Sequence, residues 1–181
     1  MTQASRCNMK KESRKKSGPS PAAEKGGARE EPPSYGAVRE SGAAGEAVAL
    51  LNQGCNCCQA VLSAYAERHG LERSTALKLG AGFGGGIGRL GETCGAITGA
   101  VLVLGLRHGS AEAAAKQKTA ELVRKFVSRF KQRHGSTNCR QLLGCDLSKP
   151  EEFEWAVKQG LLATRCPKLV RHAVEILEEL A

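Results

Sequence analysis

Residues 80–105 read GAGFGGGIGRLGETCGAITGAVLVLG, and the rest of the chain must fold around this stretch. Its first half holds seven glycines in twelve positions: Gly80, Gly82, Gly84, Gly85, Gly86, Gly88 and Gly91. Glycine adopts positive φ without steric cost, so this half is predicted to be a bending loop whose backbone another group can approach. The second half predicts a buried helix, with Thr93 as N-cap and Cys94 in the first turn.

The segments on both sides show helical periodicity. Upstream, 43–51 predicts a helix, Asn56 caps a second helix that stops at Gly70, and Ser74 begins a third that the glycine loop ends. Downstream, a long amphipathic helix is predicted from about 111 to 134, followed by a short helix that opens at Asn138 and Cys139. Pro167 fits the first position of the last helix, which makes Cys166 its N-cap.

The predicted fold is all-α, a compact multi-helix bundle with a glycine-rich loop, because no segment shows sustained strand alternation. Hydrophobic residues make up 41% and aromatic residues only 4%, so Ala, Leu, Val and Gly must fill a core of closely packed helices. Residues 1–38 are basic and proline-rich with almost no apolar side chains, and we predict a disordered tail there. Residues 39–181 are predicted to form one helical domain.

Charge and cysteine content restrict the function. The net charge of +9 permits acidic partners but does not indicate any, and we do not expect nucleic acid binding. The N-terminus has no apolar leader and the longest apolar run is too short to span a membrane, so we expect a cytoplasmic protein. Eight cysteines in that compartment favour metal or redox chemistry over structural disulfides.

Four cysteines share one local context, since each is predicted at the start of a helix: Cys57, Cys94, Cys139 and Cys166. The partial positive charge and unpaired N–H groups of a helix start favour a thiolate. Four such starts meeting at one point would suit an iron–sulfur cluster. The simplest alternative is that small buried cysteines occur by chance in an alanine-rich core.

These motifs resemble those of the C-GCAxxG-C-C family of redox-active proteins. The carrying residues are Gly54 to Leu62 (GCNCCQAVL), Cys94 to Gly99 (CGAITG), Cys139 and Cys166, within roughly 43–180. The resemblance implies an all-helical domain whose defining cysteines are Cys57, Cys94, Cys139 and Cys166. A related domain in split-Soret cytochromes lies beside an iron–sulfur site, which by analogy favours a cluster here. This chain departs from the pattern by adding Cys55, Cys58 and Cys145.

Other motifs in the sequence indicate a function less strongly than the four cysteines do. Two G-x-G-x-x-G matches lack the strand that a dinucleotide-binding loop requires. Cys55 and Cys58 form a C-x-x-C that could be a thiol–disulfide pair, although it lacks the thioredoxin-like strand context. The first alternative is therefore a thiol–disulfide protein that uses the same four cysteines together with Cys55 or Cys58. Widely spaced single cysteines differ from the paired knuckles of most structural zinc modules, which leaves a zinc-stabilised or structural interaction module as a third interpretation. The chain has no C-x-x-C-H, so covalent haem is not expected.

The sequence therefore predicts a redox protein that binds a [2Fe–2S] or [4Fe–4S] cluster through the four cysteines. Gly84, Gly85, Gly86 and Gly95 are predicted to lie against this cofactor. We expect the protein to carry electrons or sense redox state rather than transform a metabolite. An unidentified redox partner protein is expected, and an oligomer is possible.

Overall fold

The computed structural model describes residues 42–181, and this part of the chain is built from helices, with one isolated β-bridge in place of a sheet. The predicted all-α fold is confirmed, while the predicted tail and its boundary at residue 38 lie outside the described residues. In chain order the helices are α1 (Ala43–Asn52), α2 (Cys57–Ala66), α3 (Arg73–Gly80), α4 (Gly95–His108), α5 (Ala113–His134), α6 (Cys139–Leu143), α7 (Pro150–Lys158) and α8 (Leu161–Glu179). Two 3-10 turns, η1 (Glu67–His69) and η2 (Ala81–Phe83), follow α2 and α3.

The pair α2 and α4 forms the centre of the bundle. A Cβ on Gly99 of α4 would lie 2.9 Å from the carbonyl oxygen of Cys58 in α2, so only glycine permits this close approach of the two backbones. Ala60 in α2 and Ala100 in α4 are small residues that are also fully buried. The two helix starts therefore lie side by side, which brings Cys57 close to Cys94.

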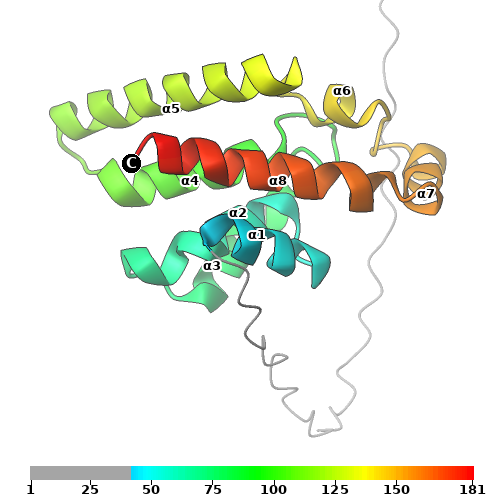
Figure 1. Cartoon of the computed structure of the whole chain (residues 1–181), viewed down its shortest axis with the longest axis horizontal. Coiled ribbons are helices and arrows are strands. Elements are labelled where there is room, and N and C mark those ends of the chain that lie inside the picture. The colour runs from blue at the N-terminus through cyan, green and yellow to red at the C-terminus, as the bar shows by residue number, and fades with distance from the viewer. Residues whose placement is uncertain (1–41) are drawn as a thin grey trace, which may run out of the picture. The chain divides into compact units, whose positions relative to one another are not determined.

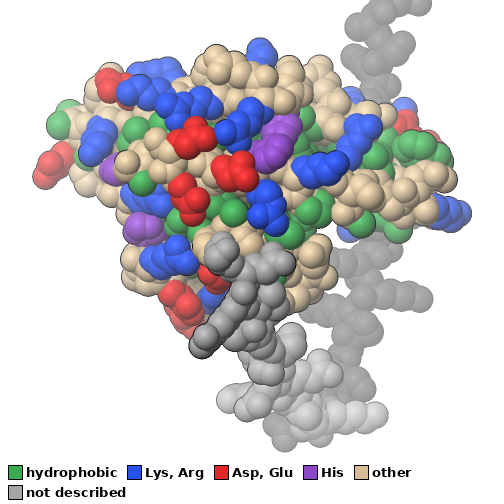
Figure 2. Space-filling model, in the orientation of Figure 1, with side chains coloured by type: hydrophobic (Ala, Val, Ile, Leu, Met, Phe, Trp, Pro, Cys, Tyr) green, Lys and Arg blue, Asp and Glu red, His purple; other side chains and the backbone are tan. Residues whose placement is uncertain are grey.

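Four helices cover this centre. Figure 1 shows α8 crossing in front of α4, α5 along one side, and α1 with α3 on the other. Helix α5 buries Phe126 and Phe130 and leaves a strongly basic outer face, which Figure 2 shows as Lys and Arg side chains along this edge of the molecule. Arg129 and Arg133 pair with Glu179 of α8 at 2.9 and 2.8 Å, which ties α5 to α8.

The predicted starts of α5 and α8 are wrong. The long helix begins at Ala113 with Glu112 as N-cap, because the Ser110 hydroxyl accepts the Glu112 N–H and holds a turn before the helix. Helix α8 begins at Leu161 after the left-handed Gly160, so Pro167 lies inside the helix and Cys166 is not its N-cap. Burial of the apolar face of α8 and packing of Leu161 and Leu162 on the α6–α7 region offset the cost of the internal proline.

Within residues 42–181, no helix combines the length and the apolarity that crossing a membrane requires.

Candidate functional site

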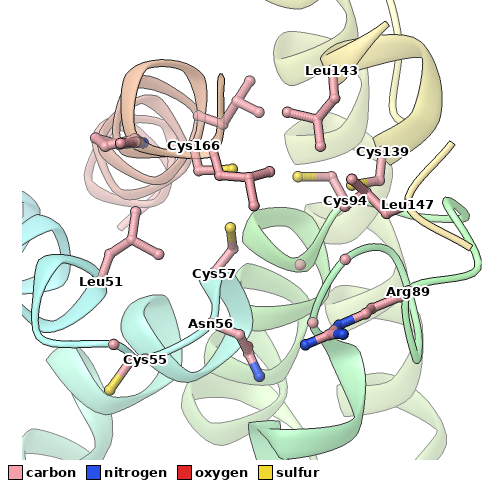
Figure 3. Close-up of a pocket in the computed structure, with 18 of the residues that line it drawn as sticks. Leu51, Cys55, Asn56, Cys57, Arg89, Cys94, Cys139, Leu143, Leu147 and Cys166 are labelled. Carbon is pink, nitrogen blue, oxygen red and sulfur yellow. The ribbon is translucent and has the colours of Figure 1, made fainter. Parts of the chain in front are cut away.

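Four thiols from four helical segments line one cavity of about 680 Å³. Cys57 is the first residue of α2, Cys94 is the N-cap of α4, Cys139 is the first residue of α6, and Cys166 lies in the second turn of α8. All four are free thiols. In Figure 3 their sulfur atoms face a common space between α2, α8 and the glycine-rich loop. The structure thus brings together the four cysteines that the sequence singled out.

Asn56 fixes the position of Cys57. Its side-chain oxygen accepts the N–H groups of Cys58 and Gln59, and Gln59 returns a bond to the Asn56 N–H, which completes a capping box. The Asn56 amide nitrogen also donates to the carbonyl oxygens of Gly80 and Ala81, both at 3.1 Å. One side chain therefore starts α2 and attaches it to the segment that enters the glycine loop.

Cys94 and Cys139 are held together by a short antiparallel contact. The Cys94 N–H donates to the Thr137 carbonyl at 2.9 Å, and the Cys139 N–H donates to the Glu92 carbonyl at 2.6 Å, on either side of the Thr93–Asn138 bridge. Thr93 takes part in this bridge, so the predicted Thr93 cap is wrong and Cys94 itself occupies the N-cap position of α4. Asn138 caps α6 as predicted, accepting the Gln141 N–H.

The glycine loop contains five consecutive residues, 85–89, whose φ lies between +58° and +75°. Gly85 and Gly86 take the predicted positive φ, whereas Gly84 is extended. A Cβ on Gly86 would lie 2.7 Å from the Cβ of Cys139, and one on Gly95 would lie 3.1 Å from the Cβ of Cys57. These two glycines make room for the cysteine-bearing segments. Contact of Gly84, Gly85, Gly86 or Gly95 with a cofactor stays a prediction; of these, Gly86 does not line the cavity.

Cys166 is positioned by contacts between α8 and α6. The neighbouring Arg165 donates from one guanidinium nitrogen to the carbonyls of Leu142 and Leu143, at 3.0 and 3.2 Å. These bonds satisfy carbonyl groups at the C-terminal end of α6. They hold the helix that carries Cys139 against the helix that carries Cys166.

Burial changes the acidity of the thiols in the direction opposite to the helix-start prediction. Burial raises the pKa of Cys94 to about 11, and the opposing N–H groups of Ala96 and Ile97 do not cancel this effect. Burial, together with the charges of Cys94 and Cys166, raises the pKa of Cys139 to about 12. The expectation of ready thiolates at Cys94 and Cys139 is therefore wrong, because losing water costs a thiolate more than a helix start returns.

Cys57 and Cys166 form a hydrogen-bonded pair. The Cys57 thiol donates to the Cys166 sulfur, which raises the pKa of Cys57 and lowers that of Cys166. Burial and the nearby Cys94 and Cys139 raise the pKa of Cys57 further. Of the four thiols, Cys166 is therefore the one that ionises first.

The additional cysteines do not join the four. Cys58 is fully buried, does not line the cavity and has a pKa raised to about 11 by burial, with Thr98 as its hydrogen-bond partner. Cys145 is buried beside Cys139 in a small apolar cluster but does not line the cavity. Cys55 lines the cavity, yet in Figure 3 its sulfur points away from the other four. Cys7 lies outside the described residues.

The cavity wall contains residues that the sequence did not single out. Apolar side chains form one side, among them Leu51, Leu147 and Phe153. Arg89, from the glycine loop, lies with its guanidinium carbon 4.4 Å from the centre of the Phe153 ring. No motif marks these residues, because they meet only when the loop, α7 and α8 come together.

The donor set fits a thiolate-bound cofactor by its chemistry, since soft sulfur ligands select iron–sulfur clusters, zinc or copper(I). Among residues 42–181, however, no group of three or more His, Cys, Asp or Glu side chains is arranged to hold a metal ion.

The fold and the cavity define a small all-helical domain that gathers four cysteines from distant parts of the chain. Residues 55–180 match the model of a family described as "Putative redox-active protein (C_GCAxxG_C_C)". The chain belongs to this C-GCAxxG-C-C family, and the resemblance drawn from its motifs is confirmed. No curated protein and no solved structure matches the chain.

Proposed function

We propose that the protein binds an iron–sulfur cluster through Cys57, Cys94, Cys139 and Cys166 and exchanges electrons with a partner protein or responds to redox state. The observation that carries this proposal is the arrangement of four free thiols around one cavity. When bound, a cluster would supply one-electron redox chemistry. Membership of a redox-active family supports the same chemistry in a coarser form.

The surroundings of the thiols suit an anionic cofactor. The first N–H groups of α2 and α4 have no carbonyl partner within their helices, and the Asn56 cap uses those of Cys58 and Gln59 but not that of Cys57. Such N–H groups can donate to sulfur and tune a reduction potential. The apolar wall of the cavity limits water, which also tunes a potential.

One observation favours a second candidate, a dithiol–disulfide protein. The Cys57–Cys166 hydrogen bond leaves Cys166 as the more readily ionised thiol of an adjacent pair. The Cys166 thiolate would attack a partner's disulfide, and Cys57 would then displace the partner from the mixed disulfide. The partner leaves as a dithiol, and Cys57 and Cys166 remain as the disulfide, so electrons and protons balance.

Anaerobic purification of the full chain separates these candidates. A cluster predicts bound iron and sulfide and broad visible absorption that bleaches on reduction. Colourless protein that holds zinc would contradict the cluster in favour of a zinc module. Metal-free protein that reversibly loses two thiols on oxidation would support the Cys57–Cys166 disulfide instead.

Single serine substitutions test the ligand set. Cys57→Ser, Cys94→Ser, Cys139→Ser and Cys166→Ser should each sharply reduce bound iron and sulfide, because a hydroxyl is a poor ligand for this chemistry. Cys145→Ser is the matched control, since it is also a buried cysteine but does not line the cavity. Iron loss in Cys145→Ser equal to that in Cys139→Ser would show that general damage, not ligation, explains the result.

A further inference from the structure

The cavity is larger than a cluster alone requires. Its volume of about 680 Å³ lies in the range of pockets that enclose small organic ligands, roughly 300–1,000 Å³. Even a four-iron core adds only eight atoms, which occupy a small part of this volume. Space for a second molecule therefore remains beside the sulfur atoms.

The charge on the cavity wall is positive. Within the described part of the chain, Arg89 is the one charged residue that lines the cavity, and no Asp or Glu does. Its guanidinium has no carboxylate partner among residues 42–181 and stacks on the Phe153 ring instead. A guanidinium on an aromatic ring keeps its N–H groups available for an anion.

The backbone of the loop is strained at this residue. Arg89 has φ +65° and Ile87 has φ +58°, values that a non-glycine residue adopts only at a steric cost. Ile87 is 41% exposed, so its own burial does not explain the conformation. The five left-handed residues instead turn the chain so that the Arg89 side chain extends back toward Asn56, as Figure 3 shows.

Much of the remaining wall is apolar. Leu51, Leu147, Phe153 and Leu162 are among the apolar side chains that line it. A ligand that satisfied both parts would carry an anionic group at one end and an apolar body at the other. An inorganic anion would leave the apolar side chains of the cavity exposed to water. A neutral apolar molecule would leave Arg89 without an anionic partner.

We propose that the cavity binds a small organic acid, whose anionic group pairs with Arg89 and whose apolar body lies along the wall next to the cysteines. The bidentate fork of arginine matches a carboxylate. The site depends on the cavity and on Arg89, and not on the identity of any cofactor. Ligand binding in the cavity would place such an acid next to the four thiols.

Competition between two matched probes tests the site. The full chain is titrated with anilinonaphthalene sulfonate, a fluorescent apolar anion, which is then displaced with octanoate or with octanol. Octanoate should displace it at about a tenfold lower concentration than octanol, because a charge-assisted bond to Arg89 adds about one order of magnitude in affinity. Iron and sulfide are measured on the same sample, so a failure of the cluster proposal is recognised separately.

Three variants make the test specific. Arg89→Gln should bring octanoate and octanol within about twofold of each other. Arg124→Gln, which removes an exposed arginine of α5 that does not line the cavity, should keep the difference. Ala163→Phe, at an exposed position on the wall, should weaken both probes by filling the cavity without touching the charge.

Equal displacement by octanoate and octanol in the unchanged protein would overturn the proposal. Retention of the octanoate preference in Arg89→Gln would also overturn it, because the anion would then bind elsewhere. Unchanged binding of both probes in Ala163→Phe would place them outside the cavity, with the same consequence.

Discussion

Gly86 and Gly88 share a positive φ but differ in their surroundings. A Cβ on Gly86 would lie 2.7 Å from the Cβ of Cys139 and from the backbone of Glu92, whereas a Cβ on Gly88 would meet nothing within 4 Å. The two positions therefore separate backbone strain from steric clash. They also test whether the loop positions a cysteine or only connects two helices.

Alanine at each position gives a matched pair of variants. Gly88→Ala should cost about 1 kcal/mol through strain alone. Gly86→Ala should cost more, about 3 kcal/mol or above, because the clash with Cys139 and Glu92 adds to the same strain. Chemical denaturation measures the free energy of unfolding, and Gly86→Ala should also lower iron content. Equal costs for the two variants would contradict a positioning role for Gly86.

Asn56 supports the start of α2 through more bonds than an ordinary cap makes. It accepts two backbone N–H groups and donates to two carbonyls near the glycine loop. Asn56→Ala should therefore destabilise the protein by at least about 2 kcal/mol. Asn138→Ala removes one cap bond from α6 and should cost about 1 kcal/mol. Thermal unfolding that ranks Asn138→Ala as the more damaging change would show that the bonds from Asn56 to the loop contribute little.

At the scale of a whole element, α8 continues through Pro167 although a proline inside a helix costs about 3 kcal/mol. Proline has no N–H, so the carbonyl of Ala163 lacks its usual partner one turn away. Both Ala163 and Pro167 line the cavity, next to Cys166. The missing backbone hydrogen bond therefore lies where α8 faces the thiols.

Pro167→Ala should raise the free energy of unfolding by about 1–3 kcal/mol, because it restores a backbone donor to an otherwise regular helix. Lys168→Ala, at an exposed position in the same helix, is the control and should change stability by less than about 0.5 kcal/mol. Denaturant titration of the two variants measures the difference. A loss of stability in Pro167→Ala would mean that the packing of the proline ring outweighs the missing hydrogen bond.

At the scale of the whole molecule, three helix ends carry histidines whose pKa is lowered from the ordinary value of 6.5. Burial is the first cause at each of them, and positive or neighbouring imidazole groups add to it: Arg107 beside His69, Lys118 beside His108, and His172 beside His134. The folded protein therefore holds fewer protons on these histidines than the unfolded chain does. Folding opposes their protonation at all three positions.

Stability should consequently fall as the pH is lowered through 6.5. The unfolded chain takes up protons first, so the free energy of unfolding decreases from pH 7.5 to pH 5.5. His134→Gln should flatten part of this slope, and His69 and His108 should account for the remainder. The interval from pH 7.5 to pH 5.5 lies above the range in which carboxylates titrate, so their protonation does not obscure the change in the free energy of unfolding. Urea titrations at a series of pH values measure the slope, and a flat or rising profile on acidification would contradict the shifts.

Much of the bundle follows from local sequence signals. The caps at Asn56 and Asn138, the stops at Gly70 and Gly135, and the apolar face of α5 act within one or two helical turns. Each of these signals depends on neighbours a few residues away, which is why the sequence is sufficient to read them. The motif order around the four cysteines likewise identifies the family without any tertiary information.

The predictions from sequence are wrong where a local signal competes with a contact between residues that are far apart in the chain. Pro167 is a good helix start by itself, but packing of Leu161 and Leu162 on the α6–α7 region extends the helix past it. Thr93 is a good cap by itself, but it pairs with Asn138 instead. The helix starts favour thiolates, yet burial of Cys94 and Cys139 raises their pKa values. The desolvation of a sulfur atom depends on all the groups that surround it in the fold, so it cannot be predicted from a short stretch of sequence.

The sequence alone determined an all-helical fold, the glycine loop and the four cysteines of the family motif. The tertiary structure alone decided that these cysteines, spread over more than a hundred residues, line one cavity with Arg89 and Phe153 on its wall. The physical reason is range: caps and periodicity are set by neighbours along the chain, whereas a cavity and its acidity are set by groups that become neighbours only after folding.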